Sequence, residues 1–208
     1  MPDTRAIEAL ARLKQGNQRF VQDKLESATG LKAGWRQGLL DGQQPFAAVL
    51  GCIDSRAPVE LVFDVGFGDL LVTRVAGNYV SSAVVASLEF SAVGLGVPLV
   101  VVLGHTRCGA VRLTLDKLES SSAQEPAHLQ ELIDQIGPAF DAYLKNADES
   151  QREVAIEKAV GLNVRSTVRK LATASTAIAE LVQKRELLIV GAEYCLETGK
   201  VQFFTDED

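Results

Sequence analysis

Four short apolar runs, separated by stretches of helical periodicity, constrain the fold of this 208-residue chain more than any other feature. They read FAAVLG at 46–51, LLVTRV at 70–75, PLVVVL at 98–103 and LLIVGA at 187–192. Runs that lack polar alternation and are rich in β-branched residues indicate strands buried on both faces, as in parallel sheets. We therefore predict an α/β, doubly wound fold with a mainly parallel sheet of four strands.

Helical patterns fill the spaces between these strands. They cover 80–94, 108–119 and 127–145, and two further pieces cover 151–185. The last segment, 201–205, follows a turn and is predicted to return as an antiparallel edge strand. Strands that alternate with helices in this way are typical of a sheet covered by helices on both faces.

The length suits one domain over 1–208, which we divide into a helical arm at 1–45 and an α/β core at 46–208. Within the arm, 4–21 has the periodicity of an amphipathic helix. Ile7, Leu10, Leu13 and Val21 fall near one face, which we expect to be its apolar face. A hydrophobic content of 47% is ample for a core.

Charge and cysteine content exclude several classes of protein. A net charge of -6 disfavours a general nucleic-acid binder, because such proteins are usually basic. Three cysteines do not make a secreted disulfide scaffold, and reduced thiols fit the cytoplasm or a compartment inside it. The apolar run at 97–104 is too short to span a membrane, and the first 20 residues lack the apolar core of a signal peptide.

Reactive side chains follow two of the predicted strands. Cys52 follows the first strand, and His105 and Cys108 follow the third. In open α/β sheets, sites form beyond the carboxyl ends of strands, where the strand order reverses. If the first and third strands are neighbours, the two loops meet there. Two thiolates and one imidazole are good zinc ligands, and three protein ligands leave a fourth position for a reactive water, as in catalytic sites.

Other interpretations of these residues remain open on spacing alone. Buried cysteines often serve only as small apolar side chains. A structural zinc would need a fourth ligand, for which Cys195 and His128 are the unused candidates. We expect neither to bind, and we place His128 on the surface. Gly104 and Gly109 flank the turn before and after the two ligands, and we expect them to permit a tight backbone there.

Asp54 and Arg56 stand two and four residues after Cys52. An arginine can hold a carboxylate through paired hydrogen bonds. An ionised Asp54 would accept hydrogen bonds only, and would therefore orient a hydroxide nucleophile with its lone pair free. The simpler alternative is a surface ion pair.

The residues around these positions resemble the β-class carbonic anhydrases. The likeness covers about residues 4–205 and includes CIDSR at 52–56, GHTRCG at 104–109, RVAGN at 74–78, SLEF at 87–90 and GAEY at 191–194. The resemblance implies a lyase that hydrates carbon dioxide reversibly to bicarbonate and a proton.

The same resemblance implies one zinc ion per chain on Cys52, His105 and Cys108, with Asp54 and Arg56 as the catalytic pair. It also implies an inactive state in which Asp54 is the fourth ligand.

The resemblance further implies a substrate-binding role for Gln43, and a homodimer or larger homo-oligomer whose N-terminal helices embrace the partner. Nucleic acid and a membrane span are not expected.

Two rival functions remain, namely hydrolysis of carbon disulfide or carbonyl sulfide on the same scaffold, and a catalytically silent, zinc-stabilised assembly module. A redox thiol enzyme is disfavoured because the sequence has no Cys-x-x-Cys pair.

Overall fold

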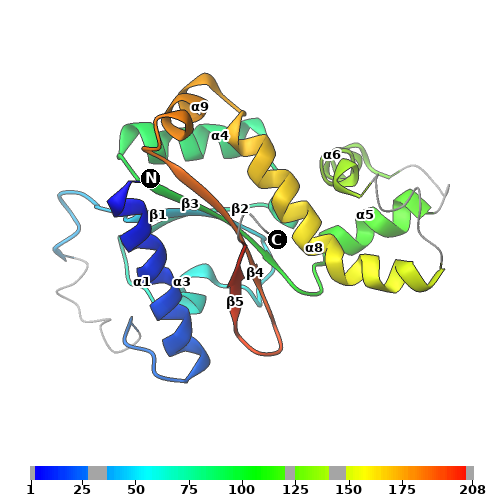
Figure 1. Ribbon diagram of the computed structural model, residues 1–208, viewed down its shortest axis with the longest axis horizontal. Helices are drawn as coiled ribbons and strands as arrows, with labels where there is room; N and C mark the ends of the chain where they lie inside the picture. The colour runs from blue at the N-terminus through cyan, green and yellow to red at the C-terminus, as the bar shows by residue number, and fades with distance from the viewer. Residues whose placement is uncertain (1–2, 28–36, 120–124, 141–148, 205–208) are drawn as a thin grey trace.

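A computed structural model describes residues 3–27, 37–119, 125–140 and 149–204. Its centre is a five-stranded sheet in the order β2-β1-β3-β4-β5 (Figure 1). The first four strands are parallel, and β5 is antiparallel to β4. Their bounds are β1 Ala47–Gly51, β2 Leu70–Arg74, β3 Leu99–His105, β4 Leu188–Tyr194 and β5 Val201–Phe203. The predicted fold class is confirmed, including the antiparallel edge strand.

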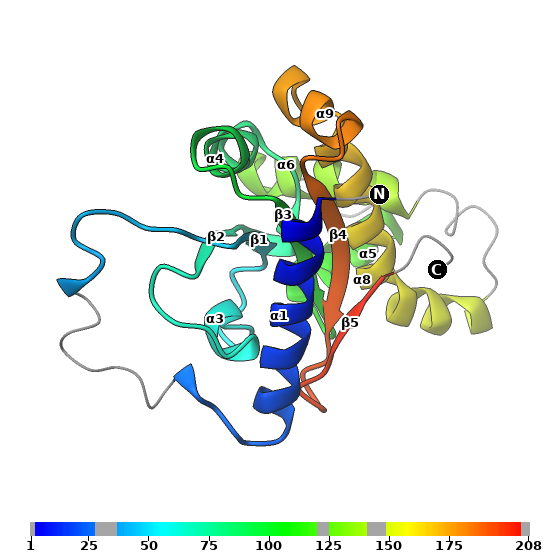
Figure 2. The same cartoon turned by 60° about the vertical axis from the view of Figure 1, so that its left-hand side comes forward.

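Helices cover both faces of the sheet (Figures 1 and 2). One face carries α4 Ser82–Glu89, α5 Gly109–Glu119, α6 Ala127–Ile136, α8 Glu149–Ala172 and α9 Thr176–Gln183. The other carries α1 Thr4–Val21 and the short α3 Val59–Val62, which the sequence patterns did not predict. The described residues also include the short helical segments η2 Ala76–Asn78, η3 Phe90–Gly94 and η4 Gly137–Ala139.

Strand β3 shows why the apolar runs lack alternation. Val100 and Val102 pack in the apolar cluster on the α8 side, and Leu99, Val101 and Leu103 pack in the cluster on the α1 side. Every residue of β3 is buried. A strand that buries both faces needs apolar residues at every position.

Helix α1 begins at the predicted residue, but its buried face matches the predicted one only in part. Ala6 and Leu13 are fully buried, whereas Ile7 is 50% exposed, so the expectation for Ile7 was wrong. The helix also packs closely against Phe63, because a Cβ on Gly16 would lie 1.8 Å from the carbonyl oxygen of that residue. Position 16 on the inner face of the helix therefore requires glycine.

Helix α1 is tied to the core of its own chain. The side chain of Asn17 donates hydrogen bonds to the carbonyl oxygens of Val62 at 3.1 Å and Gly199 at 2.9 Å. It also accepts one from the backbone N–H of Val201 at 2.8 Å. The division into an arm and a core stays a prediction.

Helix α8 approaches the sheet closely at a glycine that precedes the metal-ligand motif. A Cβ on Gly104 would lie 2.6 Å from the Val164 side chain and 2.8 Å from that of Val160. Gly104 is thus needed for helix packing, and not for a tight turn as expected. Gly109 has open space around it, and the residue with positive φ in this turn is Arg107, at 58°.

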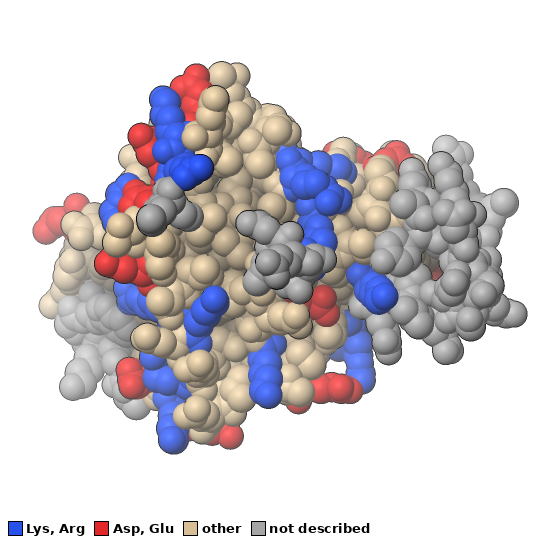
Figure 3. Space-filling view, in the orientation of Figure 1, with Lys and Arg blue, Asp and Glu red and all other residues tan. Residues whose placement is uncertain are grey.

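The charged side chains show no single continuous basic surface on the face seen in Figure 3, where Lys and Arg are scattered among acidic and uncharged residues. In the described parts of the chain, no helix is both long enough and apolar enough to cross a membrane.

A buried carboxylate, Asp64, fixes the end of α1 against α3. Its side chain is fully buried and accepts hydrogen bonds from the backbone N–H groups of Glu26 and Ser27 and from the Arg19 guanidinium. Burial alone would raise the pKa of Asp64, but the hydrogen bonds from Ser27 and Arg19 outweigh it and lower the pKa to about 2.

We therefore expect Asp64→Asn to lower the free energy of unfolding at pH 7 by about 2 kcal/mol. The folded-state pKa lies below the unfolded value near 4, so this stabilisation is present above about pH 4 and is lost as the pH falls towards 2. Urea unfolding of both proteins between pH 7 and pH 2 measures it. A difference that stays constant over that range would contradict the assignment.

Candidate metal centre

The pairing of β1 with β3 brings the predicted ligands together. Gly51 lies opposite Leu103, so the loops that follow the two strands leave the sheet side by side. The ligand atoms of Cys52, His105 and Cys108 all lie within 4.8 Å of one another. The three side chains are at most 5% exposed. This cluster is the one group of potential metal ligands found in the described residues.

The orientation of His105 is that of a metal ligand. Its Nδ1 lies 3.0 Å from the carbonyl oxygen of Thr106, and we assign the ring proton to Nδ1 because a carbonyl only accepts. The lone pair is then on Nε2, which is buried and has no hydrogen-bond partner. A buried polar atom without a partner is costly, and a metal ion would satisfy it. The donor set of two sulfurs and one nitrogen fits zinc.

The two thiols of the cluster interact directly. The Sγ atoms of Cys52 and Cys108 are 3.9 Å apart, and Cys52 also accepts a hydrogen bond from the N–H of Gly77 at 3.4 Å. The hydrogen bond from Cys108 is the main cause that lowers the pKa of Cys52. The resulting thiolate raises the pKa of Cys108. A divalent cation between them would favour loss of the second proton as well.

Asp54 and Arg56 form a paired ionic contact beside this cluster. The Arg56 guanidinium donates from Nε to Oδ1 at 3.0 Å and from Nη2 to Oδ2 at 2.8 Å, and the Arg56 N–H also donates to Oδ1. These bonds hold the pKa of Asp54 well below its ordinary value. Oδ2 of Asp54 lies 3.8 Å from Nε2 of His105. The carboxylate is therefore next to the unpartnered nitrogen.

Arg74 supports this loop, a role that the sequence motifs did not reveal. From the last position of β2 it donates to the carbonyl oxygens of Cys52 at 2.8 Å and Asp54 at 2.5 Å. Its place at the carboxyl end of a strand next to β1 was the available signal, because parallel strands end at the same edge of the sheet.

Three other residues considered at the outset lie away from the cluster. Gln43 is exposed and precedes the amino end of β1, whose five residues alone span roughly 16 Å. Gln43 therefore lies near the amino ends of the strands, whereas Cys52 of the same chain follows the carboxyl end of β1. His128 is exposed on α6, and Cys195 is a partly buried free thiol outside the cluster.

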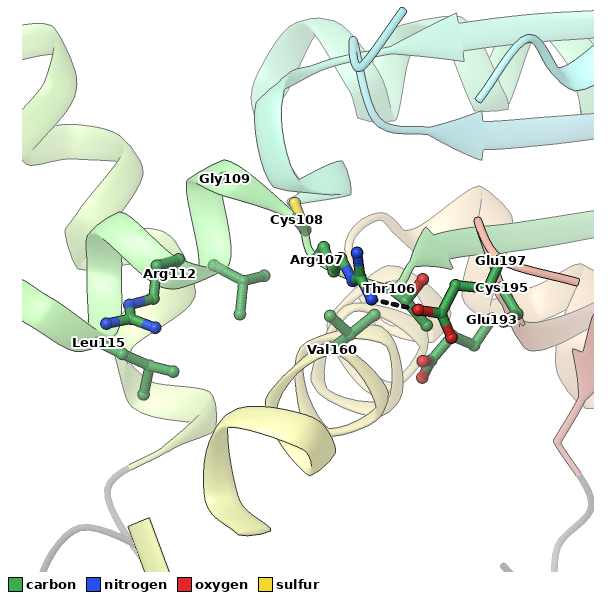
Figure 4. Close-up of a pocket in the computed structure, with 11 residues that line it drawn as sticks. Thr106, Arg107, Cys108, Gly109, Arg112, Leu115, Val160, Glu193, Cys195 and Glu197 are labelled. Atoms are coloured by element: carbon green, nitrogen blue, oxygen red, sulfur yellow. Dashed lines mark hydrogen bonds and ion pairs between the residues drawn. The ribbon is translucent and has the colours of Figure 1, made fainter. Parts of the chain in front are cut away.

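A cavity of about 630 Å³ lies beside Cys108 (Figure 4). It is lined by Val160, Glu193 and Cys195 among others, and also by Arg107 and Glu197, which form an ion pair. Burial raises the pKa of Glu193. Neither member of the Asp54–Arg56 pair lines this cavity, so we do not assign it as the substrate pocket.

We expect His105→Ala and Cys108→Ala each to reduce bound zinc from about one ion per chain to almost none, because two remaining ligands cannot hold it. Elemental analysis after dialysis against a weak chelator measures the content. Cys195→Ser is the matched control, since it removes a thiol outside the cluster, and it should keep the zinc. Loss of zinc in that control would show that the ligand set is wrong.

Comparison with known proteins identifies the family of this chain. The family model described as carbonic anhydrase matches residues 47–201. "Carbonic anhydrase 2" of Mycobacterium tuberculosis is 36% identical over 200 residues, which cover 96% of this chain and 93% of that protein. "Carbonic anhydrase" of Mycolicibacterium smegmatis is 36% identical over 207 residues, with 97% and 95% covered.

Solved structures show the same fold. A Coccomyxa β-carbonic anhydrase in complex with acetazolamide has a TM-score of 0.72 at 24% identity, over 93% of this chain and 85% of that one. A tetrameric β-carbonic anhydrase of Sordaria macrospora has a TM-score of 0.70 at 22% identity, over 89% and 95%. With the family match over most of the chain, the conclusion is that this protein belongs to the carbonic anhydrase family, in its β class, and is a zinc enzyme that hydrates carbon dioxide.

Proposed function

We propose that this chain hydrates carbon dioxide reversibly to bicarbonate and a proton at the site formed by Cys52, His105 and Cys108, with Asp54 orienting the nucleophile. The single observation that carries this assignment is the unpartnered Nε2 of His105, which is buried beside two thiols and a carboxylate. Zinc bound by these three residues would supply an open coordination position and would lower the pKa of water there.

The role of Asp54 follows from its protonation and its contacts. Its lowered pKa keeps the carboxylate ionised at neutral pH, so it can only accept hydrogen bonds. A water-derived nucleophile near Nε2 of His105 must therefore donate a hydrogen bond to Asp54. Its lone pair then faces away from the carboxylate, where carbon dioxide can be attacked. Arg56 keeps the carboxylate in this orientation through two parallel hydrogen bonds.

The contacts of Asp54 also favour the active arrangement over the inactive one. Both carboxylate oxygens are engaged by Arg56. If Asp54 were to take the fourth ligand position, at least part of this pairing would have to break. We propose that the Asp54–Arg56 pair is the active state. Asp54 binds zinc only when Arg56 forms a contact with another group.

We expect Asp54→Asn to keep zinc and to lower the carbon dioxide hydration rate at least 100-fold, because the amide can donate as well as accept. Stopped-flow hydration on samples of measured zinc content tests this. Asp3→Asn is the matched control, since Asp3 and Arg5 form the same Asp-x-Arg pair far from the cysteines. Full activity of Asp54→Asn would remove this residue from the mechanism.

We further propose that the enzyme works as a homodimer or larger homo-oligomer. The strand β2 is at the edge of the sheet, and next to it Phe90 is 61% exposed. Ile53, which precedes Asp54, is 60% exposed. Large apolar side chains exposed near a site are typical of surfaces that a partner covers. The tetrameric relative of Sordaria macrospora supports an oligomer.

In this assembly we propose that Gln43 lines the substrate pocket of the partner subunit. Within its own chain it precedes the amino end of β1, away from the metal centre at the carboxyl end. Mixed dimers of Gln43→Leu and Asp54→Asn chains test this. One of their two sites would then contain both substitutions and the other neither, so hydration should rise above that of either parent variant. If Gln43 serves its own chain, mixing restores nothing. Gln44→Leu is the control for the substitution itself.

We propose a cytoplasmic location, which the free state of Cys52, Cys108 and Cys195 supports. Recovery of the native protein from a secreted or periplasmic fraction would contradict it.

A further inference from the structure

The thiol of Cys52 depends on a backbone donor whose position is unusual. The N–H of Gly77 points at Sγ of Cys52, 3.4 Å away. Gly77 has φ 70° and ψ 20°, a left-handed conformation that favours glycine. A Cβ on Gly77 would also lie 2.5 Å from the Ile136 side chain. The segment η2 that carries the donor therefore requires glycine at this position.

The carbonyl group of Gly77 is held by a buried side chain of α8, a helix that is distant in the sequence. Asn163, on α8, is 2% exposed and donates from Nδ2 to the carbonyl oxygen of Gly77 at 2.8 Å. The close approach of α8 to β3 at Gly104 brings it there. Gly77 is thus fixed between Asn163 at its carbonyl group and Cys52 at its N–H.

We propose that Asn163 is a positioning residue for the metal centre, which acts through Gly77 to keep a hydrogen bond on the sulfur of Cys52. The inference rests on the proposed function, since it takes Cys52 as a zinc ligand. Hydrogen bonds from outside the ligand set orient metal ligands and strengthen metal binding. A donor to a thiolate is charge-assisted, so its direction matters.

The chemistry of the Gly77 peptide shows what the loss of Asn163 would do. Without the amide donor, the Gly77 carbonyl would be left buried and unpaired, which is unfavourable. Segment η2 would then shift towards another donor, and the N–H would leave Sγ of Cys52. Zinc should bind more weakly even if the protein remains folded.

The test compares Asn163→Leu, which removes the donor, with Thr167→Val on the same buried face of α8, one turn away. Zinc affinity is measured by chelator competition, and the sulfur-to-metal absorption band is recorded on the cobalt(II) proteins. We expect about ten-fold weaker zinc binding and a shifted band for Asn163→Leu. Thr167→Val should change stability alone, with affinity and band as in the wild type.

A folded Asn163→Leu protein with wild-type affinity and band would overturn the proposal, as would an equal loss of affinity in Thr167→Val. Asn163→Asp is the second variant if the leucine variant does not fold, because it keeps the shape and replaces the donor by an acceptor, and the same two outcomes apply. The proposed function fails separately: a zinc-loaded wild type that does not hydrate carbon dioxide contradicts that function and leaves the affinity comparison valid.

Discussion

The parallel pairing of β1 with β3 is the interaction on which the rest of the site depends. It aligns Gly51 with Leu103, so that Cys52 emerges beside the turn carrying His105 and Cys108. A shift in this register would separate the two halves of the ligand set, which are more than 50 residues apart in the sequence. Because both faces of these strands are buried, apolar packing fixes the register strongly.

The site combines three buried potential metal ligands with one charged pair that is partly exposed, and the two groups have different functions. His105 and the two thiols lie inside the protein, where an unpaired polar atom is costly without a cation. Asp54 lies at the border, fixed by an Arg56 side chain that is 56% exposed. The inner residues thus favour metal binding, and in the proposed mechanism the outer pair orients the nucleophile.

Most of the fold and of the candidate site could be predicted from the sequence, but the contacts between distant segments could not. The strands and the cluster of Cys52, His105 and Cys108 could be predicted from buried apolar runs and from the residue types at their ends, which are local features. The contacts of Asn163, Arg74 and Gly104 could not, because each depends on an approach between segments distant in sequence: α8 to η2, β2 to the Cys52 loop, and α8 to β3. The exposure of Ile7 on α1 was not predicted either, because the packing of the helix on the core turns Ala6 and Leu13 inwards.

The central claim is that one ion is held by two sulfurs and one nitrogen, with a further position open to solvent. X-ray absorption at the zinc edge of the loaded protein measures this most directly. The account predicts two sulfur neighbours at about 2.3 Å and two lighter neighbours at about 2.0 Å, one of them from an imidazole. Three sulfur neighbours would contradict it, because Cys195 would then have to be the fourth ligand and the site would be closed.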